Sequence, residues 1–215
     1  MKMDGLFSSR VITAYGKPDD IQEDLHPAEL ASVERAVEKR RMDFRAGRTL
    51  ARRALRQLGL DDVAIPVGEK REPVWPAGIV GTISHTRDYC GVAIARQHEV
   101  RGLGFDVERI SDVRAHLRSH IATDEELGAL MTVMGGTTEL ALALAFSGKE
   151  SFFKFQYPLS RQWIGLREVR MLPESEGFRI IPSVDIAGVC ARGETTCGKF
   201  KVCGDFMMTA IEIGA

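Results

Sequence analysis

The chain has 215 residues, enough for one domain or two small ones. Hydrophobic residues make up 44% and charged residues 27%, as in ordinary globular proteins, and the formal net charge is -1. This balance excludes a global attraction to nucleic acid or to an anionic membrane, so any basic surface must be local. No apolar run approaches the ~20 residues of a transmembrane helix, and the N-terminus lacks an apolar signal-peptide core.

The cysteines give the expected compartment. Cys90, Cys190, Cys197 and Cys203 show no CxxC spacing and no paired histidines. The pattern argues against zinc and favours buried free thiols, so we expect a protein of the reducing cytoplasm.

The first half of the chain predicts one long helix followed by short strands. Residues 27–58 have helical periodicity, with Gly59 as a stop. Residues 68–78 are rich in proline and glycine and predict a loop. Strands are expected at 79–83 and 91–95, and a turn at 96–99 leads into an antiparallel partner of the second strand over 100–110.

The second half repeats this order. Thr123 and Glu126 form a capping-box pattern, and residues 139–156 predict a strong helix. Further strands are expected at 163–171, 177–181 and 199–213. Because both halves run helix first and then strands, the order suggests a duplicated fold.

Two carboxylates, Asp106 and Glu108, alternate along the strand expected over 100–110. Alternate side chains on a strand share one face, so both point the same way, as metal ligands must. Gly102 and Gly104 precede them and allow close backbone approach, which favours a site. A strand with a solvent-facing polar side is the alternative.

Glu150 is the most informative acid, because it lies four residues after Phe146 and three before Phe153, on the apolar side of its helix. A carboxylate there is costly unless it is paired or binds a metal. The alternative is an exposed salt bridge to Lys154, worth about 0.3–0.5 kcal/mol. With Lys149 also adjacent, the acids and lysines suit Mg²⁺ chemistry on a phosphoanhydride.

A row of arginines recurs on the first helix at steps of three and four residues. Its members are Arg41, Arg45, Arg48, Arg52 and Arg56. Like charges at this spacing are mildly destabilising, so the row indicates an anionic partner, either a phosphate or RNA. A solvated face partly neutralised by nearby acids is the alternative.

The loop and strand that follow add further phosphate-binding candidates, Lys70, Arg71, Ser84 and His85. Ser84 and His85 are not a hydrolase pair, because neighbours on a strand point to opposite faces. The chain also lacks a G-x-S-x-G elbow, a Walker A motif and a strand-linked G-x-G-x-x-G.

Together these blocks resemble the 4′-phosphopantetheinyl transferase superfamily of the surfactin type, closest to its enterobactin-synthase component D branch. The resemblance rests on F-R-A-G-R-T-L-A-R-R-A-L (44–55), G-E-K-R-E-P-V-W-P-A-G-I-V-G-T-I-S-H (68–85), G-L-G-F-D-V-E (102–108) and F-S-G-K-E-S-F-F-K (146–154). The chain departs from the usual pattern at Thr82, Phe105, Val107 and Gly148, all steric changes beside ligands.

The resemblance implies an α+β fold with a pseudo-twofold duplication of two similar helix-plus-antiparallel-sheet halves and an active site in the cleft between them. The expected halves are residues 1–100, with the coenzyme A-binding helix and loop, and 101–215, with the metal and catalytic motifs. Because the duplication supplies both halves, a monomer is expected.

The implied reaction transfers 4′-phosphopantetheine from coenzyme A, the substrate, to a serine of an apo acyl, peptidyl or aryl carrier protein, releasing 3′,5′-ADP. The carrier can belong to siderophore, polyketide or fatty-acid synthesis. By resemblance the Mg²⁺ ligands are Asp106, Glu108 and Glu150, and Lys149 and Lys154 contact the diphosphate. Glu150 is also a candidate base.

The implied coenzyme contacts are Arg40, Arg48, Arg52, Lys70, Arg71, Ser84, His85, Lys149 and Lys154. The competing function is a non-catalytic RNA- or nucleotide-binding protein that uses the arginine row between Arg41 and Arg56. It leaves the three acids unexplained, and the near-zero net charge argues against it.

Overall fold

The computed structural model describes residues 2–21 and 23–215, which form two compact units. The N-terminal unit contains residues Lys2–Leu103 together with Ile213–Ala215, and the C-terminal unit contains Gly104–Glu212. The boundary falls inside strand β4, Val100–Arg109, so the two expected acids of this strand belong to the C-terminal unit.

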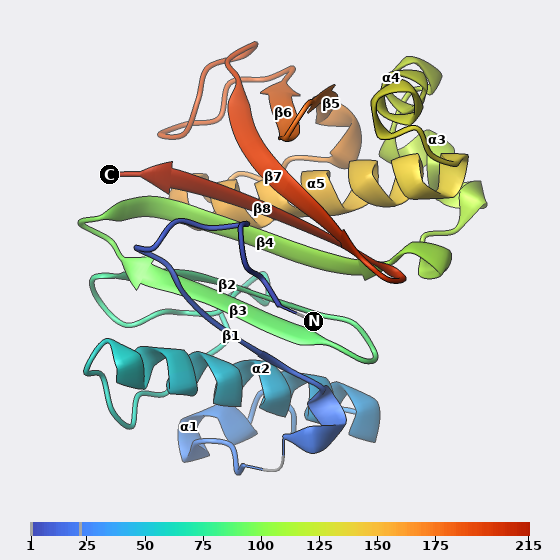
Figure 1. Cartoon of the computed structure of the whole chain (residues 1–215). Coiled ribbons are helices and arrows are strands. Elements are labelled where there is room, and N and C mark those ends of the chain that lie inside the picture. The colour runs from blue at the N-terminus through green and yellow to red at the C-terminus, as the bar shows by residue number, and fades with distance from the viewer. Residues whose placement is uncertain (1, 22) are drawn as a thin grey trace. The chain divides into compact units, whose positions relative to one another are not determined.

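The N-terminal unit is an antiparallel sheet of three strands in the order β1-β3-β2, with helix α2 packed against it (Figure 1). Alanines and leucines of α2 form the core with the valine and isoleucine side chains of β3. The elements are β1 (Ile12–Gly16), the 3₁₀ turn η1 (Pro18–Asp20), α1 (Pro27–Leu30), α2 (Glu38–Gln57), β2 (Ile79–His85) and β3 (Cys90–Arg96).

The single helix expected over 27–58 is wrong, because the chain forms two helices there. Helix α1 ends after one turn, and α2 begins at Glu38, after Val37 in extended conformation. The side chain of Glu29 in α1 is fully buried and accepts hydrogen bonds from Arg52 and from the backbone N–H of Ile65. These contacts tie α1 to distant segments, so the chain turns before α2 begins.

The C-terminal unit is a five-stranded sheet in the order β4-β8-β7-β6-β5, and helix α5 packs against it (Figure 1). Its strands after β4 are β5 (Val169–Glu174), β6 (Gly177–Pro182), β7 (Thr196–Cys203) and β8 (Phe206–Gly214). Its helical elements are η2 (Ile110–Asp112), η3 (Ala115–Leu117), α3 (Arg118–Ile121), α4 (Asp124–Met134), α5 (Thr138–Ser160) and η4 (Leu166–Glu168).

The strand pairing corrects one expectation and refines another. The predicted β3–β4 pair is wrong, because β1, which the sequence pattern did not predict, takes the second edge of β3, and β4 lies next to β8. The single strand expected over 199–213 is a hairpin of β7 and β8, with Gly204 at a φ of 57° in its turn.

Other local predictions are confirmed. The capping box at the start of α4 has both expected bonds, from the Glu126 N–H to Thr123 Oγ1 at 3.1 Å and from the Thr123 N–H to Glu126 Oε2 at 2.9 Å. The helix predicted over 139–156 lies within α5. The fold is α+β with two antiparallel sheets, as expected. Each unit has one long helix on its sheet, and the detailed duplication stays a prediction.

The cysteines depart from the expected burial. All four are free thiols, but only Cys90 is buried, and Cys197 is exposed. Within the described residues, no single helix has the length and hydropathy needed to cross a bilayer. Helices α4 and α5 pass that test only as a pair, and they meet at 110°.

A glycine on β4 allows α5 to lie close to the strand. A Cβ atom on Gly104 would lie 1.9 Å from the carbonyl oxygen of Ser151 and 2.9 Å from the Cβ of Phe155. Because one contact is to backbone, α5 would have to shift. We expect Gly104→Ala to lower the free energy of unfolding by about 1–3 kcal/mol, as measured by urea denaturation.

Gly128→Ala is the matched control. Gly128 lies inside α4, and a Cβ there meets no atom within 4 Å. Since alanine is the better helix former by about 1 kcal/mol, this variant should keep or gain stability. Equal losses from both substitutions would contradict the close-approach explanation.

Candidate active site

Three carboxylates and one lysine gather on β4 and α5 in the C-terminal unit. Asp106 and Glu108 come from β4, and Glu150 and Lys154 from α5. The ammonium of Lys154 donates to Asp106 Oδ1 at 2.6 Å, and the Asp106 side chain is only 3% exposed. We call these four residues the acid site.

The acids act strongly on one another. Burial and the charge of Asp106 raise the pKa of Glu108 to about 8. Burial, followed by Asp106, also raises the pKa of Glu150. The charge of Lys154 opposes both shifts, so this lysine is a cation that all three carboxylates share. Neighbouring negative charges favour bound protons or cations over free carboxylates.

The local sequence explains how these groups meet. On β4, Phe105 and Val107 are buried on one face and Asp106 is buried on the other, so the strand does not simply present a polar side to solvent. On α5 the spacing of four residues places Glu150 and Lys154 on one face of the helix. Gly104 removes the side chain that would hold the helix away from the strand.

Lys149 lies elsewhere. Its ammonium is enclosed, pairs with Glu126 Oε1 at 2.8 Å and donates to the Ile121 carbonyl at 2.8 Å. Glu126 also accepts the Met171 N–H at 2.8 Å, so the pair connects α5 to α4 and β5. In this structure the ammonium of Lys149 is engaged in an internal ion pair, and its contact with a diphosphate stays a prediction.

The protonation of this pair follows from its surroundings. Burial lowers the pKa of Lys149, and the bond to Glu126 opposes that shift. Burial alone would raise the pKa of Glu126, but the hydrogen bonds from Lys149 and from two backbone N–H groups lower it. These hydrogen bonds favour the charged form of Glu126, which faces the ammonium of Lys149.

The acid site has the ligand types of a hard-cation site, but its side chains are not arranged around a common ion position. Carboxylate oxygens are the ligands that Mg²⁺ prefers. Among the described residues, no group of three or more His, Cys, Asp or Glu side chains is arranged to hold a metal ion. The donor set fits such an ion, while the ammonium of Lys154 lies against the most buried of its acids.

A second site lies in the N-terminal unit, as a cavity of about 130 Å³ that we call the basic pocket. It brings together residues from α2, from the loop after it and from the end of β2. Its lining is Arg40, Asp43, Phe44, Gly47, Arg48, Val67, Arg71, Pro73, Ile83 and His85. Four of the predicted coenzyme contacts therefore meet in one cavity.

Two of the basic side chains in this pocket have close neighbours. The guanidinium of Arg48 lies over the Phe44 ring at 4.4 Å and donates to the Ile65 carbonyl at 2.7 Å. Burial lowers the pKa of Arg48 to about 10, so it stays charged at neutral pH. His85 Nδ1 lies 3.8 Å from Asp43 Oδ2.

Arg71 is in a left-handed backbone conformation, with a φ of 70°. This region costs energy for a residue with a side chain, and glycine would adopt it freely. The turn closes through a bond from the Gly68 N–H to the Glu72 carbonyl at 2.8 Å. A strained arginine that lines a cavity is consistent with a role for its side chain.

Three other predicted coenzyme residues do not line the basic pocket. Arg52 is buried and donates to Glu29 at 2.6 Å and to the Asp24 carbonyl at 2.9 Å. Lys70 is exposed on the loop beside Arg71. Ser84 is buried, because it points to the opposite face of β2 from its neighbour His85.

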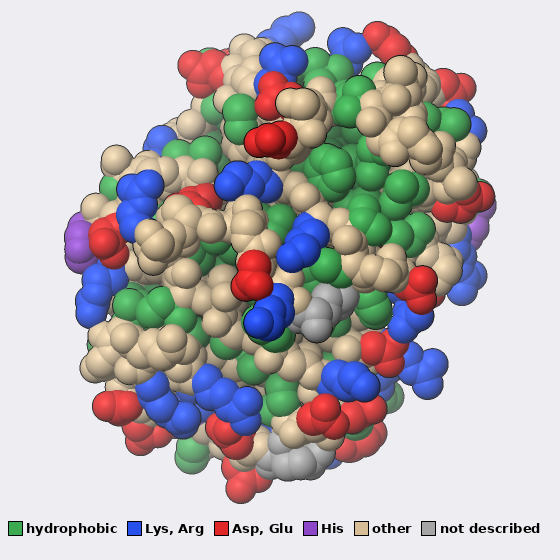
Figure 2. Space-filling view, in the orientation of Figure 1, with side chains coloured by type: hydrophobic (Ala, Val, Ile, Leu, Met, Phe, Trp, Pro, Cys, Tyr) green, Lys and Arg blue, Asp and Glu red, His purple; other side chains and the backbone are tan. Residues whose placement is uncertain are grey.

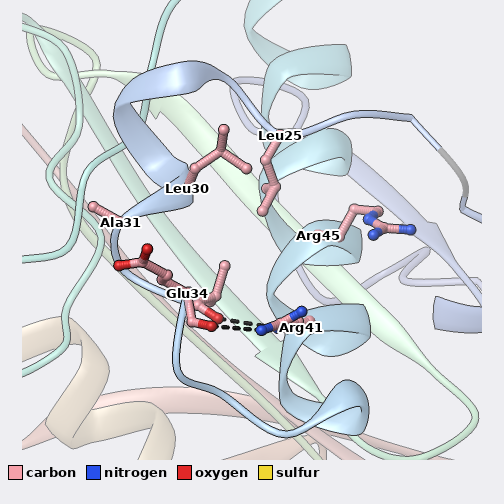
Figure 3. Close-up of a pocket in the computed structure, with 7 residues that line it drawn as sticks. Leu25, Leu30, Ala31, Glu34, Arg41 and Arg45 are labelled. Carbon is pink, nitrogen blue, oxygen red and sulfur yellow. Dashed lines mark hydrogen bonds between the residues drawn. The ribbon is translucent and has the colours of Figure 1, made fainter.

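The arginines of the row have different environments in the structure. Arg48 and Arg52 are buried. Arg41 and Arg45 line a separate cavity of about 470 Å³, where Arg41 donates to the carbonyls of Val33 and Glu34 (Figure 3). Basic and acidic side chains are interspersed over the face shown in Figure 2.

Sequence reasoning missed an aromatic cluster on the C-terminal unit. Phe153 stacks on Tyr157, and Trp163 meets Phe153 edge-on with ring centroids 4.9 Å apart. Trp163 is 68% exposed, unusual for so large an apolar side chain. The spacing of four residues between the first two rings was a usable signal.

Sequence reasoning identified Glu126 only as a helix cap. Its ion pair with Lys149 was missed because the two residues lie on different helices and are far apart in the sequence.

The comparisons with known proteins agree along most of the chain. Residues 27–95 match the family described as 4′-phosphopantetheinyl transferase N-terminal domain, and residues 102–195 match the 4′-phosphopantetheinyl transferase superfamily. The first matched region contains the residues of the basic pocket, and the second contains the residues of the acid site.

Two of three individual relatives are named 4′-phosphopantetheinyl transferase, and the third is an enterobactin synthase component. The chain is 35% identical to the 4′-phosphopantetheinyl transferase Npt of Nocardia iowensis, over 74% of this chain and 70% of that protein. It is 32% identical to PptT of Mycobacterium tuberculosis, over 86% and 84%. It is 40% identical to enterobactin synthase component D of Escherichia coli, over 58% of each.

The Lys149–Glu126 pair gives a prediction about stability. Lys149→Met leaves the buried Glu126 carboxylate without its counter-ion, and we expect a loss of about 3–5 kcal/mol in the free energy of unfolding, measured by urea denaturation. Combining Lys149→Met with Glu126→Gln should restore part of it, because no unpaired charge remains. Additive losses in the double variant would contradict this coupling.

Proposed function

The chain belongs to the 4′-phosphopantetheinyl transferase superfamily, and from this premise we propose that it modifies carrier proteins with 4′-phosphopantetheine from coenzyme A, and that the basic pocket and the acid site are its candidate phosphate-binding and metal-binding sites. The observation that carries this proposal is the convergence of Arg40, Arg48, Arg71 and His85 on one cavity. Separate sites for anions and for a hard cation suit a substrate that carries both a single phosphate and a diphosphate.

The basic pocket suits the 3′-phosphate end of coenzyme A. Arg48 is fixed by Phe44 and the Ile65 carbonyl, so its remaining donors are already oriented. His85 lies 3.8 Å from the carboxylate of Asp43, and Arg40 lines the cavity with an exposed side chain. Fixed donors around a small cavity recognise a phosphate and orient the molecule that carries it.

The acid site suits the diphosphate. Mg²⁺, held by Asp106, Glu108 and Glu150, would neutralise charge that develops on the phosphate oxygens. Lys154 is the lysine with access to the same oxygens, because it is partly exposed, whereas Lys149 is enclosed. We assign Lys149 to positioning: its pair with Glu126 fixes the rotation of α5 and hence the direction of Glu150.

In the proposed reaction, a serine oxygen of the apo carrier bonds to the β-phosphorus of coenzyme A. The bond from that phosphorus to the bridging oxygen breaks, and 3′,5′-ADP leaves. Glu150 is the candidate acceptor of the serine proton, and burial and Asp106 raise its pKa in the metal-free site.

The carrier belongs to siderophore, polyketide or fatty-acid synthesis, with enterobactin-type peptide synthesis favoured by the relatives named enterobactin synthase component D. We propose action in the cytoplasm as a monomer. The RNA-binding alternative needs a solvent-facing arginine row. Arg48 and Arg52, in the middle of that row, are buried and therefore could not contact RNA.

The metal assignment is tested by Asp106→Ala. We expect this variant to keep the circular dichroism spectrum of the parent chain and to lose transfer by at least about a hundredfold, the scale of losing a principal electrostatic contact. The measurement is the mass gain of an apo carrier incubated with coenzyme A and Mg²⁺. Glu176→Ala, an exposed acid outside the site, is the control. Near-normal turnover by Asp106→Ala would overturn the assignment.

The pocket assignment is tested with Arg40→Ala. If this arginine contacts the 3′-phosphate, the variant should raise KM for coenzyme A by roughly tenfold, the loss of about 1.4 kcal/mol of binding. KM for 3′-dephospho-coenzyme A should change little. Arg56→Ala, on the same helix but outside the pocket, should affect neither substrate. Equal effects of Arg40→Ala on both substrates would contradict the contact.

A further inference from the structure

Lys154 is the basic side chain of α5 that has both a carboxylate partner and room to move. Its ammonium contacts Asp106 Oδ1 at 2.6 Å, yet its side chain is 27% exposed. Lys149 has no such freedom, because its side chain has no exposed surface and bonds on two sides. The two lysines that flank Glu150 therefore have different environments.

Asp106 contacts Lys154 through one oxygen, Oδ1, so a divalent cation held by the same carboxylate would lie near the ammonium. A Mg²⁺ ion binds carboxylate oxygens at about 2.0–2.1 Å. An ammonium at hydrogen-bond distance from the same carboxylate would then face the metal charge at close range, where repulsion is large in a buried site. Metal binding and the Lys154–Asp106 contact are therefore in competition.

The lysine side chain suits this competition. It carries a compact charge on a flexible four-carbon stem, so it can exchange partners without moving the backbone. Three buried or half-buried carboxylates without any cation would be costly, and Lys154 reduces that cost while no metal is bound. A diphosphate offers the displaced ammonium a new anionic partner.

We propose that Lys154 is a built-in substitute cation, which neutralises the acid site of the free enzyme and moves from Asp106 to the substrate diphosphate when Mg²⁺ binds. This role rests on the proposed function. It makes Mg²⁺ binding weak in the free enzyme and stronger with coenzyme A, and by linkage Mg²⁺ strengthens coenzyme binding equally.

The test measures binding of Mg²⁺ alone to the full chain by titration calorimetry, without coenzyme or carrier. Mildly alkaline pH keeps protons from competing for the carboxylates. Lys154→Met should bind Mg²⁺ about tenfold more tightly than the parent chain, although it transfers phosphopantetheine poorly. Lys154→Arg keeps the charge and should bind Mg²⁺ as weakly as the parent. Lys39→Met, an exposed lysine on α2, should leave Mg²⁺ affinity unchanged.

Unchanged or weaker Mg²⁺ affinity in Lys154→Met overturns the proposal, because the lysine would then only support Asp106. If Lys154→Met does not fold, Lys154→Gln and the ¹⁵N-lysine ammonium signal of the parent chain serve instead. That signal should shift on adding Mg²⁺ alone, and a fixed signal overturns the proposal. Transfer activity is read separately by carrier mass, so active transfer without competition rejects the substitute-cation role and leaves the proposed function intact.

Discussion

The close approach of α5 to β4 at Gly104 is the constraint on which the acid site depends. The carbonyl oxygen of Ser151 occupies the space where a side chain on that strand residue would lie. With the helix this near, an ammonium on α5 reaches the buried carboxylate of Asp106 at 2.6 Å. A larger residue would separate the two elements and, with them, the acids that each contributes.

Distance alone does not orient a helix, and the rotation of α5 is fixed at Lys149. Its ion pair with Glu126 holds one side of the helix against α4 and β5. One residue further along, Glu150 is turned away from that pair and faces the carboxylates of β4. The buried ion pair thus orients the helix, and such structural specificity is the best-supported reason to keep a buried charge pair that adds little stability.

Local patterns predicted much of this structure, and long-range contacts explain the rest. The capping box of Thr123 and the alternation of Asp106 with Glu108 depend only on near neighbours, so both were readable from the sequence. The break between α1 and α2 was not, because it follows from the burial of Glu29 against distant partners. The same holds for Lys149, because its place in the sequence beside Glu150 does not indicate that it pairs with Glu126.

The pairing of Lys149 with Glu126 shows that the segment K-E-S-F-F-K (149–154) depends on a residue outside it. A helix that received these six residues alone would bury a lysine with no counter-ion, and it would lose the orientation of the acid beside it. The segment and the upstream glutamate must therefore be gained, lost or transplanted together. A search for related active sites should require the segment 149–154 and a glutamate at the position of Glu126, because the segment alone lacks the partner of its buried lysine.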